Sequence, residues 1–305
     1  MKNMKHVLLA AALGMGSVLW AENEFRIQPT AGWKKDGDVC TLDYGTAQKG
    51  PVYLFMDVKP DTFYRISWQV RRANPEVPAI ALWVETSRKH IAQFEGENRV
   101  HYWNSGKETK LKLRFDLDRG AAGQIKLGNI RVEEVDSKEL LNNLVPNGDF
   151  EKGGIGDFWQ ATNGSVPESA SLVKSPDFFS GSRSLCLKPS PKGERYPIRS
   201  AYMPAIPGKK AVLTFWAKSH GEAALGCTID CSSPTNIHTG KHPHKSTSFK
   251  LTPDWNEYRL EYEVPDDLST YPALTDRMAR IWFSNSGKDT IYIDNVEFRQ
   301  AAEDK

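Results

Sequence analysis

The sequence carries almost no net charge, because 40 Lys and Arg residues stand against 38 Asp and Glu residues and leave a formal charge of +2. Its basic residues are spread among acidic ones along the chain. Proteins that bind nucleic acid present a basic stripe or patch to the phosphates. The sequence therefore excludes nucleic acid as an expected partner. Two hydrolase patterns, Gly-x-Ser-x-Gly and His-Glu-x-x-His, are also missing.

Cysteine is scarce, with four in 305 residues. Cys40 in the first half and Cys186 in the second lie in matching apolar segments, and both are predicted to be buried strand thiols. Cys227 and Cys231 share one face of a predicted strand, where four extended residues separate them by about 13 Å. This exceeds the roughly 7 Å limit for a disulfide, so the two pair only if the chain turns between them.

Long apolar runs are absent except near the N-terminus. Lys2 and Lys5 precede an apolar run from Val7 to Trp20, which ends at the small residue Ala21. This order is typical of a signal peptide, and the run is too short to span a bilayer comfortably. We therefore expect residues 1–21 to be removed. The mature chain is predicted to be secreted or periplasmic and to have no transmembrane segment.

The two halves of the chain end in similar phrases. Ile125–Val132 closes the first half and Ile291–Phe298 closes the second, with apolar residues in matching places. A repeat this long indicates two copies of a whole domain, because solenoid repeats have periods of about 20 to 50 residues. The matching extends to Leu111–Leu117, which we align with Tyr258–Val264.

Nearly every apolar segment alternates with period two, which predicts strands with one buried face. Tyr64, Ile66 and Trp68 show this pattern in the first half, and Leu213 and Phe215 show it in the second. No long helical pattern interrupts either copy, so the fold class is all-β, with two tandem sandwiches or jelly rolls. The predicted organisation is a signal peptide at 1–21, a sandwich at 22–135, a linker at 136–142, a second sandwich at 143–300 and a polar tail at 301–305.

An ordered set of motifs fills the second half. It begins with Asn-Leu-Val-Pro-Asn-Gly-Asp-Phe-Glu at 143–151, continues through Gly-Ser-Arg-Ser-Leu at 181–185, and reaches Trp255 before the final strand. This set resembles the carbohydrate-binding modules of the CenC type, the family 4/9/16/22 group, over residues 143–300. The resemblance implies a galactose-binding-like jelly-roll β-sandwich, with the first half as a diverged copy.

Alternation also predicts which aromatic residues face solvent in the second copy. If Leu213 and Phe215 point inward, Trp216 points outward, and by the same rule Arg280 and Trp282 point outward beside buried neighbours. Sugars stack on aromatic rings while their hydroxyls bind polar side chains. Trp216, Arg280 and Trp282 are therefore candidate carbohydrate ligands; the alternative is that a loop or the other domain covers the two tryptophans.

The first copy contains a similar set of candidates. Outward alternation places Trp83 beside Gln69 and Arg71, and Tyr102 and Trp103 lie in a segment predicted to connect two strands. Aromatic residues in loops are often functional, because loops need fewer of them for packing. We predict carbohydrate contacts for all five, with a packing role as the alternative. Three other tryptophans are assigned to the framework of the sandwiches: Trp68, Trp159 and Trp255.

The resemblance further implies a structural Ca²⁺ ion in the second domain only. Modules of this type often hold the ion where the first strand, the Gly-Ser turn and the last strand converge. Carried over by position, the ligands are Asp149, Glu151, Gly181, Ser182 and Asp294, and oxygen ligands suit Ca²⁺. The alternative is that the carboxylates bond to the backbone in turns. The first copy has Gly128 in the place of Asp294, so no ion is expected there.

Three histidines lie in a polar loop: His238, His242 and His244. Imidazoles this close in sequence could bind zinc, but their spacing matches no closed zinc site. A solvated loop, or one that donates hydrogen bonds to a glycan, is the favoured interpretation.

These features together predict an exported carbohydrate-binding protein that retains a poly- or oligosaccharide by aromatic stacking and polar contacts. One alternative is an accessory or catalytic component of a polysaccharide-degrading system, and another is a structural or protein-binding sandwich without a glycan site. Catalysis is the less favoured hypothesis, because both halves are accounted for by sandwiches. An enzyme here would be a glycoside hydrolase or a polysaccharide lyase, with two carboxyl groups facing each other across a cleft.

Overall fold

The structure is a computed structural model of the 305-residue chain. The predicted signal peptide, His238 and residues 302–305 of the predicted tail lie outside the described part. The residues that it describes are 26–30, 32–44, 50–73, 80–84, 89–92, 97–117, 123–160, 168–174, 177–189, 197–231, 242–267, 269–271 and 277–301.

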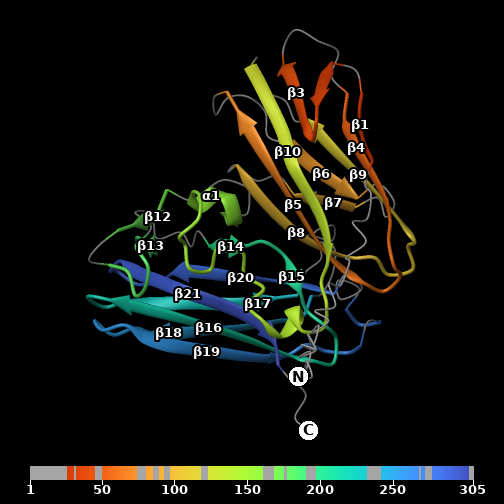
Figure 1. Ribbon diagram of the computed structural model, residues 1–305. Coiled ribbons are helices and arrows are strands. Elements are labelled where there is room, and N and C mark those ends of the chain that lie inside the picture. Colours follow the sequence, from red (N-terminus) through yellow and green to blue (C-terminus); the bar gives the residue numbers. More distant parts are fainter. Residues whose placement is uncertain are drawn as a thin grey trace, which may run out of the picture.

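The first half of the chain forms two antiparallel sheets of five strands each (Figure 1). In sheet order, sheet A contains β1 (Arg26–Pro29), β4 (Val52–Asp57), β9 (Lys110–Leu117), β6 (Ile80–Val84) and β7 (Lys89–Ala92). Sheet B contains β2 (Trp33–Asp36), β3 (Val39–Tyr44), β10 (Gly123–Glu134), β5 (Phe63–Arg72) and β8 (Asn98–Asn104).

The second half forms two further antiparallel sheets. In sheet order, sheet C contains β11 (Trp159–Gln160), β14 (Ile198–Ser200), β20 (Met278–Asn285), β17 (Ala224–Asp230) and β18 (His244–Lys250), with β15 (Met203–Pro204) paired to β20. Sheet D contains β12 (Ala170–Val173), β13 (Ser184–Leu187), β21 (Ile291–Gln300), β16 (Lys210–Ser219) and β19 (Asn256–Glu263). Two short helices, η1 (Glu139–Leu141) and α1 (Ile155–Phe158), precede them.

The two halves have the same topology. When the strands of each half are counted from one to ten, leaving out β15, both halves have one sheet in the order 1-4-9-6-7 and one in the order 2-3-10-5-8. The expectation of two tandem sandwiches is therefore confirmed. The alignment of Leu111–Leu117 with Tyr258–Val264 is wrong, because β9 corresponds to β20 and β19 corresponds to β8. Strands of similar length and alternation cannot be told apart from the pattern alone.

The repeated phrase at the end of each half marks a β-bulge in the last strand. Asn129 in β10 and Asn295 in β21 both have positive φ, 50° and 47°. The pairing register of β10 with β5, and of β21 with β16, shifts at these places. Asparagine tolerates the left-handed region better than most residues, and an extra residue in one strand bends and twists it. The shared phrase therefore specifies the same bend in both copies.

Each pair of sheets encloses an apolar core built by alternation. In β4, Val52, Leu54 and Met56 are buried while the residues between them are half-exposed. The largest fully buried rings include Trp68 and Trp159, which confirms their assignment to the framework. The four cysteines are free and buried, as expected for Cys40 and Cys186.

The Asn-Leu-Val-Pro-Asn-Gly-Asp-Phe-Glu segment lies along the last strand of its sandwich. The N–H of Leu144 donates to the carbonyl of Phe298 at 2.8 Å, and the N–H of Val296 donates to the carbonyl of Gly148 at 2.8 Å. The side chain of Asn143 also bonds to the backbone of β21 in both directions. The motif therefore pairs with β21 beyond the stretch of that strand that pairs with β13.

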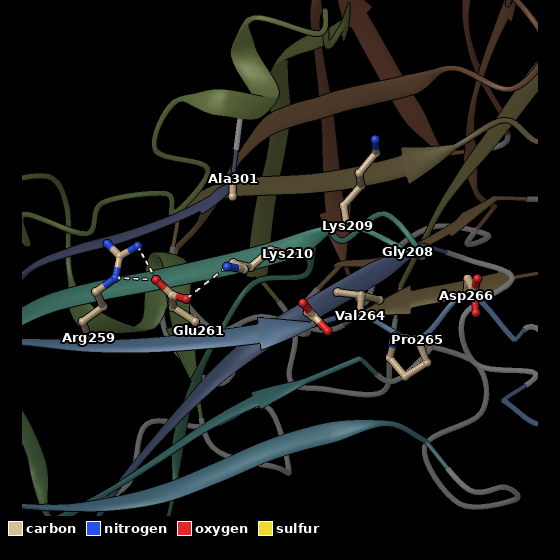
Figure 2. A pocket seen from close by; sticks show the side chains of 10 residues that line it. Gly208, Lys209, Lys210, Arg259, Glu261, Val264, Pro265, Asp266 and Ala301 are labelled. Carbon is tan, nitrogen blue, oxygen red and sulfur yellow. Dashed lines mark hydrogen bonds and ion pairs between the residues drawn. The ribbon is translucent and has the colours of Figure 1, made fainter. Parts of the chain in front are cut away.

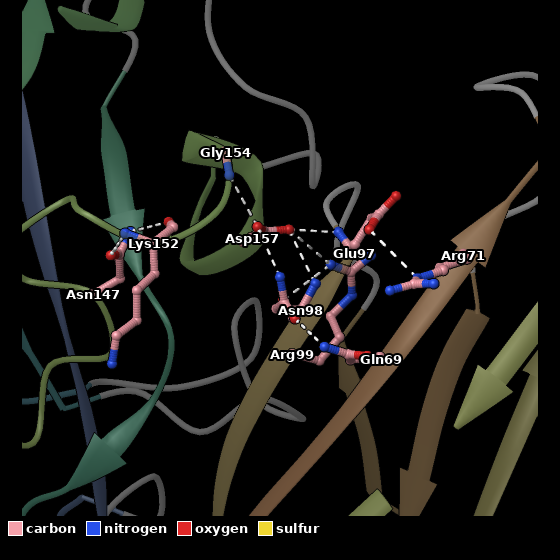
Figure 3. Close-up of polar contacts among 9 residues, drawn as sticks. All are labelled: Gln69, Arg71, Glu97, Asn98, Arg99, Asn147, Lys152, Gly154 and Asp157. Atoms are coloured by element: carbon pink, nitrogen blue, oxygen red, sulfur yellow. Dashed lines mark hydrogen bonds and ion pairs between the residues drawn. The ribbon is translucent and has the colours of Figure 1, made fainter. Parts of the chain in front are cut away.

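The two sandwiches pack against each other through β8 and α1. Asp157 of α1 accepts hydrogen bonds from the backbone N–H groups of Glu97 and Asn98, at the start of β8 (Figure 3). Phe63 and Tyr102 of the first half belong to the apolar cluster of the second. Among the described residues, no helix has the length and apolar character needed to cross a membrane.

Candidate functional site

One row of side chains crosses the outer face of sheet C from edge to edge. Directly paired residues of antiparallel strands share a face, and Trp282 is paired with Arg199 on one side and Thr228 on the other. Neighbouring Ile281 and Phe283 are fully buried on the inner face, so the row points outward. Its members in sheet order are Gln160, Arg199, Trp282, Thr228 and Ser246.

Two guanidinium groups lie on the ring of Trp282. Cζ of Arg280 is 4.6 Å from the ring centroid, and Cζ of Arg199 is 5.5 Å from it. Arg280 also lies 4.9 Å from the ring of Tyr202 and forms an ion pair with Asp230 at 3.2 Å. Burial, followed by the nearby charge of Arg280, lowers the pKa of Arg199 to about 10. Arg199 therefore remains charged at neutral pH.

This face is covered at one end and open at the other. Arg199, Tyr202 and Arg280 are buried, with Arg280 only 2% exposed, whereas Trp282 is half-exposed. His101 of β8 makes an edge contact with Tyr202, with 6.4 Å between ring centroids, so the first sandwich contributes to the cover. The prediction of solvent exposure for Arg280 is wrong. Alternation gave the correct face, but packing and the ion pair remove this side chain from solvent.

Sheet A presents the equivalent face in the first sandwich. Trp83 is paired with Arg114, and Arg114 with Tyr53, in one outward row. Cζ of Arg114 lies 5.0 Å from the Trp83 ring, and Nζ of Lys112 lies 4.4 Å from the Tyr53 ring and 5.8 Å from the Phe55 ring. All five side chains are half-exposed.

Gln69 and Arg71 do not lie beside Trp83, contrary to the prediction. They belong to β5 in sheet B, whereas Trp83 belongs to β6 in sheet A, because consecutive strands cross from one sheet to the other. Gln69 donates to Asn98 at 2.8 Å, and Arg71 lies 4.0 Å from Glu97 (Figure 3). Both lie near the contact between the sandwiches.

Tyr102 and Trp103 lie in strand β8 and are buried, so their prediction as exposed loop residues is wrong. Trp103 packs against Tyr64 in the first core, with ring centroids 5.9 Å apart. Tyr102 points to the other side and joins the apolar cluster of the second sandwich. An edge strand covered by a neighbouring domain is buried on both faces, which its own sequence pattern does not reveal.

Trp216 is half-exposed but lies on sheet D, on the opposite side of the sandwich from Trp282. Phe179 stacks on it, with ring centroids 3.8 Å apart and planes 9° from parallel. Trp255 lies 6.0 Å from Phe179 and is half-exposed, so it joins this surface cluster and does not lie in the core framework that we expected. The structure thus separates the two candidate tryptophans of the second domain.

The predicted calcium ligands make hydrogen bonds with backbone N–H groups. Oε1 of Glu151 accepts from the N–H groups of Ser182 and Arg183, and Oε2 accepts from the Ser182 hydroxyl. Gly181 has a φ of 68°, and a Cβ there would lie 2.6 Å from Oε1 of Glu151. The side-chain hydrogen bond from Ser182 is the main cause of the lowered pKa of Glu151. Oδ1 of Asp149 lies 3.4 Å from the N–H of Glu151.

The carboxylate of Asp294 also accepts hydrogen bonds from backbone N–H groups. Its Oδ2 accepts from the N–H groups of Phe179 and Ser180, and its Oδ1 from the N–H of Asn295. Burial raises the pKa of this fully enclosed carboxyl group. Ca²⁺ requires six to eight oxygen ligands, and here the carboxylates are surrounded by N–H and O–H donors. In this arrangement the carboxylate oxygens accept hydrogen bonds from the protein, which does not fit a bound Ca²⁺ ion. The arrangement favours the alternative that the carboxylates bond to the backbone in turns.

A chelator titration tests the calcium prediction directly. A bound ion at 100 times its Kd adds about 2.7 kcal/mol of stability, because it binds the folded state alone. Since Glu151 and Asp294 already have backbone partners, we expect EDTA to leave the melting temperature unchanged. A fall of several degrees that CaCl₂ reverses would establish the ion, and Mg²⁺ in place of CaCl₂ serves as the control.

Of the predicted histidine group, His242 and His244 fall within the described residues. Their ring centroids are 5.9 Å apart, and Nε2 of His242 lies 3.4 Å from Oδ1 of Asp230. No group of three potential metal-ligating side chains occurs within the described part of the chain. His242 therefore extends the polar network around Arg280, and zinc binding stays the less favoured alternative for this loop.

A polar hollow of about 820 Å³ lies on the second sandwich near the ends of β16 and β19 (Figure 2). Glu261 forms ion pairs with Arg259 at 2.6 Å and Lys210 at 3.4 Å. Hydrogen bonds from Arg259 and Lys210 lower the pKa of Glu261, so this group does not suit the role of a general acid. The residues that line the hollow include no aromatic ring on which a sugar could stack.

The sequence analysis missed several residues of the two outer faces. Tyr53 and Phe55 alternate with buried Val52, Leu54 and Met56, so the same rule that selected Trp282 would have identified them. Three other residues reach the outer face of sheet C only because of which strands are neighbours in the sheet, and no local sequence pattern identifies those neighbours. These are Arg199, Tyr202 and Asp230.

No protein-family model and no curated protein matches the sequence. Among solved structures, the tandem of two family 22 carbohydrate-binding modules from Paenibacillus barcinonensis Xyn10C is similar at 16% identity and a TM-score of 0.37, over 89% of this chain and 94% of that one. The family 61 module TmCBM61, solved with β-1,4-galactotriose, is 13% identical over 52% of this chain and 99% of its own, with a TM-score of 0.36.

A family 4 carbohydrate-binding module is 18% identical over 52% of this chain and 99% of its own, with a TM-score of 0.36. These neighbours are carbohydrate-binding modules, the class that the sequence motifs resemble. At such identities and TM-scores they carry no argument about a ligand or a residue. The two-sandwich architecture rests on the sheets of this chain.

Proposed function

We propose that the protein is an exported carbohydrate-binding protein that retains a poly- or oligosaccharide on the outer sheet faces, without covalent chemistry. One observation carries the proposal: the row Gln160, Arg199, Trp282, Thr228 and Ser246, which places one half-exposed tryptophan among polar side chains across the whole of sheet C. Aromatic rings bind the C–H faces of sugars, and amide, hydroxyl and guanidinium groups bind the hydroxyls. Each site would be weak, with avidity from the equivalent face of sheet A.

The open end of the row gives a sugar access to Trp282. Thr228 is half-exposed and Ser246 is exposed, and their hydroxyl groups are 2.9 Å apart. Gly226 on the same face has no side chain, and a Cβ there would lie 2.5 Å from Oγ of Ser284. The small hydroxyl group of Ser284 therefore occupies the space that a side chain at Gly226 would fill.

Replacing Trp282 by alanine is expected to weaken retention of the bound polysaccharide at least about tenfold. Buried or half-buried tryptophans are among the residues whose truncation costs most at interfaces, often 2 kcal/mol or more, and 1.4 kcal/mol corresponds to a factor of ten. The measurement is binding of the mature chain to a polysaccharide array, read for retention and for released sugars.

Trp216→Ala is the matched control, because it removes a half-exposed tryptophan from the other sheet of the same sandwich. Circular dichroism and melting temperature should show that both variants fold. Loss with Trp216→Ala alone would move the site to the Phe179 cluster, and unchanged retention in both would remove it from the second sandwich. Released reducing ends or unsaturated sugars would replace binding by catalysis.

A further inference from the structure

The aromatic rings on both outer faces are overlain by cations. On sheet A, Nζ of Lys112 lies over Tyr53 and Cζ of Arg114 lies over Trp83, at 4.4 and 5.0 Å from the ring centroids. On sheet C, Arg199 and Arg280 lie at 5.5 and 4.6 Å from the ring of Trp282. The combination of an aromatic ring with a neighbouring cation therefore recurs on the two equivalent sheets.

The ring and the cation change places between the copies. Tyr53 of β4 is paired with Arg114 of β9 in the first sandwich, and in the second Arg199 of β14 is paired with Trp282 of β20. Because β4 corresponds to β14 and β9 to β20, each copy has a ring–cation pair between the same two strands, with the ring and the cation on opposite strands in the two copies. Both copies thus place an aromatic ring beside a positive charge, although the ring and the cation come from different strands in each copy.

A cation over a ring alters what the ring binds. The electrostatic attraction between them is worth about 0.5 to 1 kcal/mol at exposed sites, and a neutral sugar must displace the cation to stack on the ring face. A sugar that carries an anionic group loses less, because the cation can move to that group while the ring receives the C–H face. The arrangement therefore favours anionic sugars over neutral ones.

The outer face of sheet A also has a positive excess. The described residues of this face contribute four cations and two carboxylates. Asp116 is paired with Arg114 at 3.1 Å, and Asp57 is the register partner of Lys110. The four cations are Arg26, Lys110, Lys112 and Arg114.

Sheet A is the more accessible of the two faces. Tyr53, Phe55 and Trp83 are half-exposed, and the side chain of Arg114 is 27% exposed. Arg199 and Arg280 of sheet C are buried, beside the contact with β8. Because β8 belongs to sheet B, its packing against the second sandwich leaves the outer face of sheet A uncovered among the described residues.

We infer that the outer face of sheet A binds an anionic glycan, in which a uronate carboxylate or a sulfate ester is held by Lys112 and Arg114 while Tyr53, Phe55 and Trp83 contact the sugar rings. This inference rests on the proposed carbohydrate binding and names its ligand class. Lysine acts as a point charge, whereas the planar guanidinium of arginine forms paired hydrogen bonds with carboxylate or sulfate oxygens.

The test compares polymers that differ in charge alone. The full mature chain is assayed for retention on polygalacturonate and on its methyl ester, and on a sulfated galactan and its desulfated form. We expect at least about tenfold stronger retention of one acidic form than of its neutral partner, with the advantage falling as salt increases. Whichever pair shows the difference identifies carboxylate or sulfate as the recognised group.

The double variant Lys112→Gln with Arg114→Gln should abolish this difference, because it removes both charges and keeps side chains of similar length. Lys126→Gln is the matched control: Lys126 is exposed on the other sheet of the same sandwich, and its loss should leave the difference intact. Melting temperatures should show that all variants fold.

Three other outcomes would overturn the inference. Equal retention of acidic and neutral forms, together with a loss of retention in Trp282→Ala, would reject the anionic ligand and keep carbohydrate binding. Retention of polyglutamate as strong as that of the acidic polysaccharide would make the face a general anion surface. No retention of any polysaccharide, acidic or neutral, would reject both the inference and the proposed function.

Discussion

Replacing Asp157 by alanine is expected to loosen the two sandwiches from each other and to lower the free energy of unfolding by about 3 to 5 kcal/mol. Asp157 is only 4% exposed and accepts hydrogen bonds from the N–H groups of Glu97, Asn98 and Gly154. The buried guanidinium of Arg99 lies 4.0 Å away. Without the carboxylate, these donors and this charge lose an acceptor in a place with little water.

Urea titration and small-angle scattering measure the two parts of this prediction. The wild-type chain should unfold in one transition, because Phe63 and Tyr102 join the second apolar cluster, and the variant should show two transitions or a larger radius of gyration. Asp61→Asn is the control at the same contact: it removes the charge that pairs with Arg277 at 2.6 Å in a more exposed place, and asparagine tolerates the φ of 50° at this position. Exposed pairs contribute about 1 kcal/mol or less.

A cost below about 1 kcal/mol for Asp157→Ala, equal to that of the control, would assign the contact to apolar packing by Phe63 and Tyr102 instead.

The contact between the sandwiches also affects the access of a ligand to sheet C. His101 of β8 touches Tyr202 on sheet C, and Tyr202 lies against Arg280. A chain with loosened sandwiches should therefore expose more of the row around Trp282, with a change in glycan retention on sheet C and none on sheet A.

Much of the architecture was accessible from the sequence because it depends on short-range patterns. Alternation identified the strands, their inner faces and the outward side of Trp83 and Trp282, and the repeated phrase identified the duplication. The structure adds the reason for the phrase: Asn129 and Asn295 have positive φ at a bulge. The repeated phrase is thus a requirement of backbone geometry.

The failures concern contacts between residues far apart in the sequence. Gln69 and Trp83 are 14 positions apart but lie in different sheets, because β5 and β6 cross from one layer to the other. Tyr102 lies in a strand and is covered by the second sandwich, which its own sequence segment does not show. Arg280 was on the predicted face, but Asp230 and Tyr202 enclose it. Alternation predicts on which face of a sheet a side chain lies, but it does not predict which other part of the chain covers that face.

The segment that carries the calcium prediction also has a role in backbone geometry. Asn147 and Phe150 have positive φ, and the Asn147 side chain bonds to the backbone of Lys152 in both directions. Gly181 leaves space for the carboxylate of Glu151. Two of the predicted ion ligands, Glu151 and Gly181, therefore also hold the segment against the turn at Ser182.

Gly148→Ala is expected to reduce stability by about 3 kcal/mol or more, or to prevent folding of the second sandwich. A Cβ at this position would lie 2.0 Å from the carbonyl oxygen of Val296, and the N–H of Val296 donates to the carbonyl of Gly148. Overpacking typically costs 1 to 3 kcal/mol, and the backbone shift that relieves it also breaks this hydrogen bond, which is worth about 1 kcal/mol.

Gly154→Ala provides the matched control for this change, measured by the same urea titration. A Cβ there meets nothing within 4 Å, and its φ of −96° suits any residue. Replacing glycine at such a site restricts the unfolded chain and changes stability by about 1 kcal/mol or less. If both alanines cost the same, Gly148 is not a point of close backbone approach, and the opening motif does not depend on its contact with β21. A large loss confined to Gly148→Ala would instead show that the opening motif depends on close backbone packing against β21.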